Sequence, residues 1–227
     1  LLHPIEVAHI LAKMHMDVDT IVASLLHDTV EDTDVSLQQI EEDFGADVAF
    51  LVDGVTKLSK FEFNDKQQRK AESFRKMLLA MAEDLRVLLL KLADRLHNMQ
   101  TLFHLKEAKQ VRIAQETREI YVPLANRLGI SWMKTALEDL AFKYLQPKDY
   151  SNISKWLHRD KDKLNEYIRE MEELLKQEIQ KAQMDCEVSG RVKHCYGIYK
   201  KMKKRDVPFE QVYDLIGFRV ILTDSSQ

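Results

Sequence analysis

Helical periodicity with few breaks constrains the fold of this chain more than any other feature of its sequence. Across residues 1–182, apolar side chains recur every three or four positions, as in Ile21, Val22 and Leu25. This spacing is typical of the buried face of an α-helix. Only 6 glycines and 4 prolines occur in 227 residues, and helix interiors tolerate these two residue types least. The sequence therefore predicts a mainly α protein.

Local start and stop signals divide this region into separate helices. Ser36 and Gln39 have the spacing of a capping box, and Gly45 suits the end of the helix that follows. Pro123 is expected to kink a later helix, and Gly129 to end it. The remaining pattern predicts helices at residues 47–58, 64–83, 85–105, 109–128, 131–145 and 153–182.

The pattern changes near residue 184, where strand-like residues appear. We expect strands at residues 186–188 and 212–222, with a helix at residues 196–204 between them. The predicted domains are an all-helical domain at residues 1–150, a helical connector at residues 151–184 and the incomplete start of an α+β domain at residues 185–227. We expect the connector helix to couple the two domains.

Several features lead us to expect a cytoplasmic location. No signal peptide opens it, and its apolar runs are too short to span a membrane. Cys186 and Cys195 do not form a zinc-like pair of pairs, and we interpret them as reduced thiols. The first residue is Leu1 rather than Met, so we expect a piece of a longer protein.

Charge is segregated along the chain, although the net charge is only −3. Residues 17–53 hold eleven acidic side chains and no Lys or Arg, whereas residues 191–205 hold seven Lys and Arg and no acid. This favours a cation site in the first half and a phosphate site near the end. Two solvated helix faces would give the same pattern.

A cluster of acidic residues follows His27 directly. If residues 27–32 form one helix, His27 lies above Glu31, and Asp28 lies above Asp32. Carboxylates this close repel one another, and a divalent cation would reverse the sign of that interaction. The sequence therefore predicts a metal site here.

A second polar stripe lies on the predicted buried helix at residues 85–105. Lys91, Asp94, Asn98 and Thr101 share one side of it, while leucines cover much of the rest. Burying a polar group lowers stability unless it is hydrogen-bonded, paired with a charge or bound to a metal. An ordinary exposed helix face is the alternative interpretation.

Together with His3, these residues resemble the ligand set of the HD superfamily of phosphohydrolases, which is a His, a His-Asp pair and a distant Asp. In this chain the matching residues are His3, His27, Asp28 and Asp94. Two imidazoles and two carboxylates suit Mn²⁺, with Mg²⁺, Fe²⁺ or Zn²⁺ as competitors.

Longer motifs resemble the Rel/SpoT family of (p)ppGpp enzymes. The stretches similar to its hydrolase domain and the helices that follow are residues 2–4, 26–34, 52–58, 91–99, 123–130 and 137–141. The stretches similar to the opening of its synthetase domain are residues 190–202 and 213–219. Asn126 departs from the family, which commonly has His there.

The resemblance implies a role for each matching hydrolase residue. His3, His27, Asp28 and Asp94 would bind one Mn²⁺, and Glu31 and Asp32 would orient and deprotonate the attacking water. Arg95, Asn98 and Thr101 would line the nucleotide pocket. The reaction would remove the 3′-pyrophosphate of ppGpp or pppGpp to give GDP or GTP. The family also places basic residues before the His-Pro motif, and that stretch is absent here.

The resemblance also implies a synthetase site. Arg191, Lys193 and Lys201 would hold the phosphates of ATP, and Asp214 would bind Mg²⁺ for pyrophosphate transfer to GDP or GTP. Because other synthetase residues would lie beyond residue 227, we expect no synthesis from this chain. We expect no binding of membrane or nucleic acid, and any ribosome contact would lie outside the chain.

Two other functions fit part of the pattern. One is a different HD hydrolase, such as a nucleotidase or a cyclic-nucleotide phosphodiesterase, although the stretch at residues 94–98 favours (p)ppGpp. The other is a silent regulatory domain that binds nucleotide. The presence of Glu31, Asp32 and every metal ligand favours an enzyme.

Overall fold

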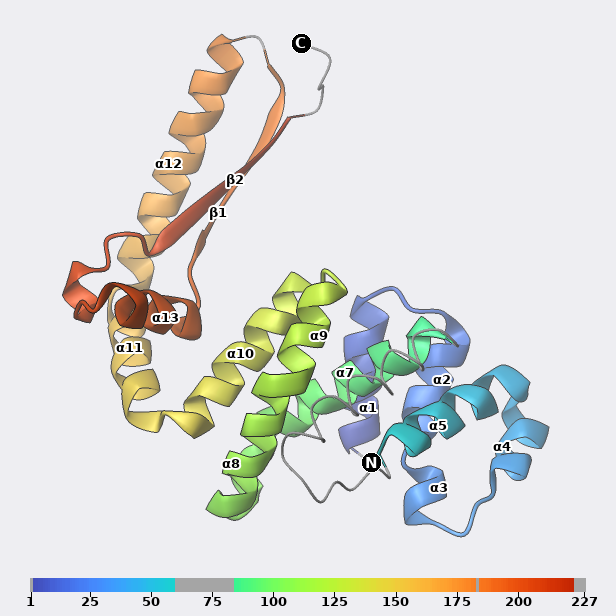
Figure 1. The fold of residues 1–227 in the computed structure, drawn as a ribbon. Coiled ribbons are helices and arrows are strands. Elements are labelled where there is room, and N and C mark those ends of the chain that lie inside the picture. The colour runs from blue at the N-terminus through green and yellow to red at the C-terminus, as the bar shows by residue number, and fades with distance from the viewer. Residues whose placement is uncertain (1, 60–83, 183, 223–227) are drawn as a thin grey trace. The chain divides into compact units, whose positions relative to one another are not determined.

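The computed structural model describes residues 2–59, 84–182 and 184–222, and the chain divides into two compact units, Leu1–Ala141 and Phe142–Gln227 (Figure 1). The predicted helix at residues 64–83 lies outside the described residues. Within the described part, none of the helices combines the length and the apolar character needed to cross a membrane.

The first unit is entirely helical over its described residues, which confirms the mainly α prediction. Its elements are α1 (Leu2–Lys13), α2 (Val18–Leu26), α3 (Thr29–Asp32), α4 (Leu37–Phe44), α5 (Ala46–Ser59), α7 (Leu85–Gln100), a 3₁₀ turn (Leu102–His104), α8 (Glu107–Glu116), a π-helical segment (Thr117–Tyr121), α9 (Val122–Arg127) and most of α10 (Ser131–Leu145).

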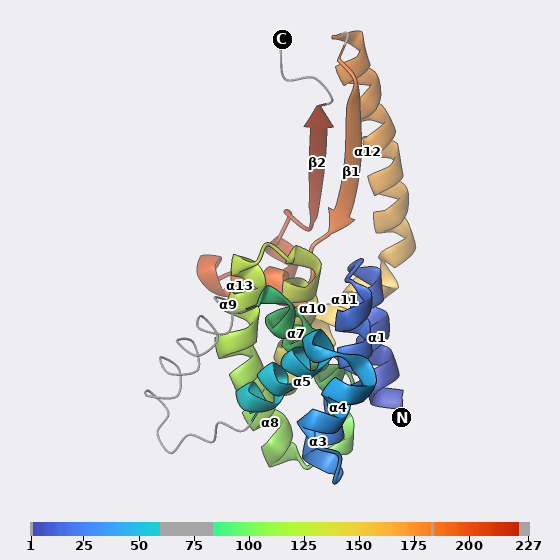
Figure 2. The ribbon, with the colours of Figure 1, turned by 90° about the vertical axis from the view of Figure 1, so that its right-hand side faces the viewer.

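The core of this unit lies around α7, which packs against both α1 and α5 (Figure 2). Leu11 of α1, Leu51 of α5 and Leu90 of α7 are fully buried in it. Burial of each such side chain contributes about 1.5–3 kcal/mol relative to exposure. This packing fixes α7, and therefore its polar stripe, against the N-terminal helices.

The acidic motif does not form one helix, so that prediction is wrong. The helix α2 ends at Leu26, and α3 begins only at Thr29. His27 Nδ1 lies 2.7 Å from the carbonyl oxygen of Ser24, which in a continued helix would accept the N–H of Asp28. Competition of a side chain for a backbone acceptor explains the break. Asp32 N still donates to Asp28 O, at 2.9 Å.

The helix predicted at residues 109–128 contains a π-helical segment. This segment ends at Tyr121, two residues before Pro123. A proline ring clashes with the carbonyl four residues earlier, and a wider turn relieves that clash. Gly129 follows with φ +74°, as expected for a residue that ends a helix.

The Ser36 half of the capping prediction for α4 is confirmed, and it gives a stability test. Ser36 Oγ accepts the N–H of Gln39 at 3.2 Å. We expect Ser36→Ala to lower the free energy of unfolding of the first unit by about 1 kcal/mol, because one helix N–H loses its acceptor. Ser36→Asp keeps an acceptor and should remain close to the wild type. Equal urea midpoints for all three proteins would contradict the prediction.

The second unit combines helices with a two-stranded sheet. Its elements are the end of α10, α11 (Pro147–Arg159), α12 (Lys161–Lys181), β1 (Cys186–Val192), α13 (Cys195–Arg205), a 3₁₀ turn (Phe209–Gln211) and β2 (Ile216–Leu222). Its core surrounds Phe142, whose ring centroid lies 4.7 Å from that of Tyr199. Cys186 and Cys195 are free thiols, as predicted.

The single helix predicted at residues 153–182 is wrong, because Asp160 separates α11 from α12. Aspartate is a poor residue in helix interiors, since its short carboxylate competes with the backbone. Here that carboxylate accepts a hydrogen bond from Arg159 at 2.9 Å. The strand β1 contacts α12 directly, so α12 packs within the second unit (Figure 1).

The two strands are antiparallel, with Gly190 opposite Phe218. A Cβ at Gly190 would lie 2.7 Å from side-chain atoms of both Phe218 and Ile168 of α12. The close approach of β1 to α12 therefore requires glycine at this position.

Candidate metal centre

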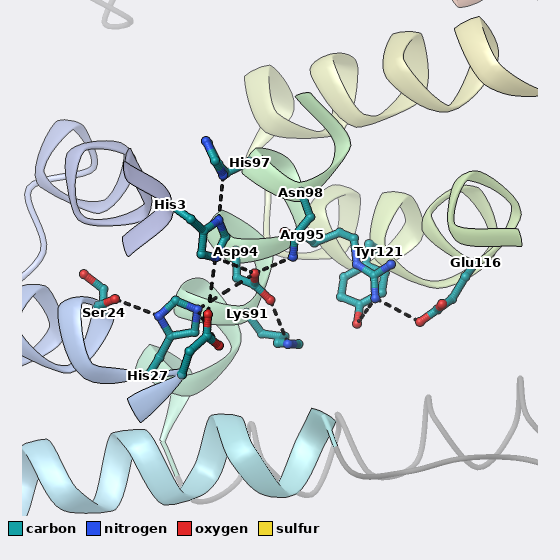
Figure 3. Close-up of polar contacts among 11 residues, drawn as sticks. His3, Ser24, His27, Lys91, Asp94, Arg95, His97, Asn98, Glu116 and Tyr121 are labelled. Carbon is teal, nitrogen blue, oxygen red and sulfur yellow. Dashed lines mark hydrogen bonds and ion pairs between the residues drawn. The ribbon is translucent and has the colours of Figure 1, made fainter. Parts of the chain in front are cut away.

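Three segments of the first unit bring the predicted ligands together (Figure 3). His3 comes from the first turn of α1, His27 and Asp28 from the turn between α2 and α3, and Asp94 from the middle of α7. Ligand atoms of His3, His27 and Asp28 all lie within 4.8 Å of one another. Asp94 Oδ1 lies 3.3 Å from His3 Nε2 and 4.0 Å from His27 Nε2.

His27 is oriented by the backbone of its own helix. A carbonyl oxygen can only accept, so the contact with Ser24 O places the proton of His27 on Nδ1. The other nitrogen, Nε2, then carries a lone pair. This atom is buried without a hydrogen-bond partner and lies 3.1 Å from Asp28 Oδ1. A lone pair beside carboxylate oxygens in a buried position fits a cation.

Asp94 is held as a buried anion. Lys91 Nζ lies 2.7 Å from Asp94 Oδ2, and Asn98 Nδ2 donates to Asp94 Oδ1 at 2.6 Å. Burial raises the pKa of Asp94, but the hydrogen bond with His3 and the charge of Lys91 outweigh it and hold the pKa below its usual value. The carboxylate therefore stays ionised, as a ligand must be.

The pKa of His3 is shifted in the opposite direction. Its hydrogen bond to Asp94 raises the pKa above 6.5, although burial opposes the shift. When His3 is protonated, its Nε2–H occupies the position that a cation would take between His3 and Asp94. Binding a metal would displace that proton.

The donor set fits one divalent cation. It offers two ring nitrogens and two carboxylates. The two negative charges of the carboxylates balance the charge of a divalent ion. A structural Cys-rich zinc site is excluded for these donors, because no cysteine contributes.

The predicted catalytic carboxylates lie beside this cluster. Glu31 and Asp32 belong to α3, directly after the turn that carries Asp28, and both are exposed to solvent. Their roles stay predictions.

The predicted nucleotide-binding residues lie in different surroundings. Arg95 is mostly buried, donates to Glu116 Oε1 and Tyr121 Oη at 3.0 Å each, and lies over the Tyr121 ring. Asn98 is exposed at the edge of the metal cluster. Thr101 Oγ1 donates to the carbonyl of His97 at 3.1 Å. Asn98 is therefore the residue of this group in direct contact with a predicted ligand.

The predicted synthetase residues partly converge in the second unit. Lys193 and Lys201 both form ion pairs with the carboxylate of Asp214, and Lys193 Nζ also lies 3.1 Å from the Asp214 carbonyl oxygen. Arg191 is exposed on β1, opposite Gly217. Two ammonium groups can bind phosphate oxygens, and the carboxylate beside them can bind the metal ion that accompanies the phosphate.

Lys91 was placed on the polar stripe but given no role, and His97 and Ser24 were not predicted to take part. Lys91 could have been recognised from its place on the same helix stripe as Asp94, where a buried ammonium needs an anion. His97 lies 2.6 Å from His3 but is 94 residues away in the sequence, so no local signal predicts that contact. The Ser24 contact involves a backbone carbonyl, which the residue type does not indicate.

This fold and these donors define the class of helical domains that hold a divalent cation between imidazoles and carboxylates. The chain belongs to the HD domain family, whose model matches residues 1–131, and membership implies a divalent metal. A second model, described as a region found in RelA / SpoT proteins, matches residues 190–227. The chain thus joins an HD domain to the start of a RelA/SpoT region.

Several curated proteins are similar along almost the whole chain. The GTP pyrophosphokinase of Myxococcus xanthus is 51% identical over 224 residues, which cover 97% of this chain and 30% of that protein. The bifunctional (p)ppGpp synthase/hydrolase SpoT of Escherichia coli (strain K12) is 48% identical over 223 residues, covering 98% of this chain and 32% of that protein. The chain therefore spans about a third of the length of these relatives.

Proposed function

We propose that this chain hydrolyses the 3′-pyrophosphate of ppGpp or pppGpp, giving GDP or GTP and pyrophosphate, as part of alarmone control in the stringent response. The observation that carries the proposal is the buried Nε2 lone pair of His27, beside Asp28, His3 and Asp94. The similarity to a protein named as a (p)ppGpp synthase/hydrolase supports the choice of substrate.

His3, His27, Asp28 and Asp94 would hold the cation, for which we propose Mn²⁺. When bound, it supplies a Lewis acid that lowers the pKa of water and offsets charge on the phosphate. Glu31 and Asp32 accept the proton of the attacking water, since both are exposed carboxylates beside Asp28. Water oxygen joins the phosphorus, the bond to the ribose 3′-oxygen breaks, and that oxygen takes up a proton.

The nucleotide would contact the C-terminal half of α7. Asn98, which is exposed and bonded to Asp94, and Thr101, one turn further, would lie near guanine and ribose. Arg95 would contribute positive charge from its fixed position on Tyr121 and Glu116. Residues 1–150 would form this hydrolase domain, working in the cytoplasm.

For a longer parent protein we also propose a synthetase site. Lys193 and Lys201, with Arg191, would hold the phosphates of ATP, and Asp214 would bind Mg²⁺ for transfer of pyrophosphate to GDP or GTP. The shared ion pairs of both lysines with Asp214 support this assignment. Residues 185–227 would be the start of that domain, after a connector at residues 151–184.

The test is release of pyrophosphate from ppGpp by metal-stripped chain, with and without added Mn²⁺. We expect release with Mn²⁺ and almost none with EDTA, because water attack on a polyanion needs the cation. A cyclic nucleotide and a nucleoside monophosphate serve as competing substrates. The chain should not transfer pyrophosphate from ATP to GDP.

Three outcomes separate the alternatives. Faster cleavage of a competing substrate would indicate another HD hydrolase. Binding of ppGpp without release, in a chain extended at its N-terminus as well, would indicate a silent regulatory domain. Release that is unaffected by EDTA would contradict the proposed mechanism.

A further inference from the structure

His3 has a partner on each of its two ring nitrogens. On one side, Nε2 faces Asp94 Oδ1 at 3.3 Å and Asp28 Oδ2 at 3.8 Å. On the other side, Nδ1 lies 2.6 Å from Nδ1 of His97, one turn after Asp94 on α7 (Figure 3). The two rings are tilted by 52° with centroids 4.7 Å apart, so the contact is a hydrogen bond between nitrogens rather than a stack. His3 is therefore held between the metal cluster and His97.

Metal binding by His3 would decide which of the two nitrogens donates. Two ring nitrogens at 2.6 Å share one proton, so one donates and the other accepts. A metal ligand needs its lone pair on the nitrogen that faces the site, which for His3 is Nε2. The proton of the neutral ring must then be on Nδ1, and His97 Nδ1 must accept it. The opposite arrangement would leave a proton on His3 Nε2 and block coordination.

We propose that His97 is a positioning residue that fixes His3 in the tautomer able to bind metal through Nε2. This inference rests on the metal site of the proposed function. The same task is performed for His27 by the carbonyl oxygen of Ser24, at 2.7 Å. Both imidazoles thus donate Nδ1–H to an acceptor behind them, which leaves both Nε2 atoms directed at the same point.

A purely structural role for His97 predicts different behaviour. His97 is half-buried near the C-terminal end of α7, so a ring of similar size could fill its space without accepting a hydrogen bond. If packing alone mattered, His97→Phe would keep full metal affinity. If the acceptor matters, Phe should fail, whereas Asn, which can place an amide oxygen near the position of Nδ1, should work.

The experiment is a calorimetric titration of metal-stripped chain with Mn²⁺. We expect His97→Phe to bind Mn²⁺ about 10–100-fold more weakly than the wild type, as is typical when the partner of a metal-binding histidine is removed. His97→Asn should stay within about threefold, because its amide oxygen replaces the acceptor. The matched control is His9→Phe, the same change at an exposed histidine on α1, which should bind like the wild type.

A second measurement does not depend on any variant. In the wild-type chain loaded with Zn²⁺, long-range ¹H–¹⁵N spectra should show the ring proton of His3 on Nδ1.

Two results would overturn the proposal. One is a His97→Phe variant that binds Mn²⁺ as tightly as the wild type, and the other is a His3 proton on Nε2. A wild-type chain that binds no Mn²⁺ would overturn the metal site and this inference together. A chain that binds Mn²⁺ but releases no pyrophosphate would contradict the proposed function only, and the titration would still decide the role of His97.

Discussion

We expect the Asp28→Ala variant to lose at least about 10³-fold of its Mn²⁺-dependent pyrophosphate release while remaining folded. Asp28 contributes one of the two carboxylates, and its oxygens lie 3.1 Å from His27 Nε2 and 3.8 Å from His3 Nε2. Loss of a ligand weakens binding of the cation. The Lewis acidity of that cation contributes several kcal/mol to catalysis, and each 1.4 kcal/mol corresponds to about a tenfold change in rate.

The fold should tolerate this change because of where Asp28 lies. Its side chain is 44% exposed, so its removal leaves no buried cation without a partner. The free energy of unfolding should therefore change by less than about 1 kcal/mol. Removing one carboxylate from an acidic cluster also reduces repulsion in the metal-free protein.

Two measurements on the same preparation check this prediction. Pyrophosphate release is followed at a Mn²⁺ concentration that just saturates the wild type, and urea unfolding is followed in EDTA. Asp34→Ala is the matched control, since Asp34 is an exposed carboxylate shortly after the same motif. An Asp28→Ala variant with near-normal release would remove Asp28 from the ligand set. A variant that is inactive because it is unfolded would leave the ligand assignment without support from this experiment.

Much of the fold followed from local sequence signals. The helix predicted at residues 131–145 matches α10 in both bounds, because Gly129 and Pro147 limit it on either side. The strand–helix–strand order at the end was also correct. Local signals are sufficient where a cap, a glycine or a proline alone determines the end of an element.

One error occurs where a side chain competes with the backbone. The break at His27 depends on a bond from an imidazole to the carbonyl of Ser24, and apolar periodicity continues across it. At Asp160 the carboxylate instead accepts from the Arg159 side chain and caps no backbone N–H. Neither residue is a strong helix breaker by type, so only the three-dimensional contact distinguishes these sites from ordinary helix interior.

The candidate site divides in the same way. Its four proposed ligands were recognisable as a set, because His-Asp and the distant Asp resemble a known family. The contacts that support these ligands were not recognisable from the sequence. His3 and His97 are far apart in the sequence, and the contribution of Lys91 to the site depends on its burial. Residues that touch the ion can thus be read from motifs, whereas residues that orient the ligands require the structure.

The ion pair between Lys91 and Asp94 gives the largest expected effect on stability. The two side chains are 11% and 6% exposed, and Lys91 Nζ lies 2.7 Å from Asp94 Oδ2. Although burial opposes the charge on Lys91, Asp94 keeps the pKa of Lys91 above its usual value, so both groups are ionised. We expect Lys91→Met to lower the free energy of unfolding of the metal-free chain by about 3 kcal/mol, because the buried Asp94 loses the ammonium that pairs with its Oδ2.

The double variant Lys91→Met/Asp94→Leu separates this cause from loss of packing. Two apolar side chains remove the stranded charge, so the double variant should regain most of the lost stability while binding no Mn²⁺ tightly. Urea unfolding in EDTA measures all three proteins, with Lys109→Met, an exposed lysine on α8, as the control that should change by less than about 0.5 kcal/mol. If Lys91→Met were as stable as that control, the pair would contribute nothing net. In that case Lys91 would serve only to aim Asp94 Oδ1 at the cation, because its ammonium still occupies the other oxygen.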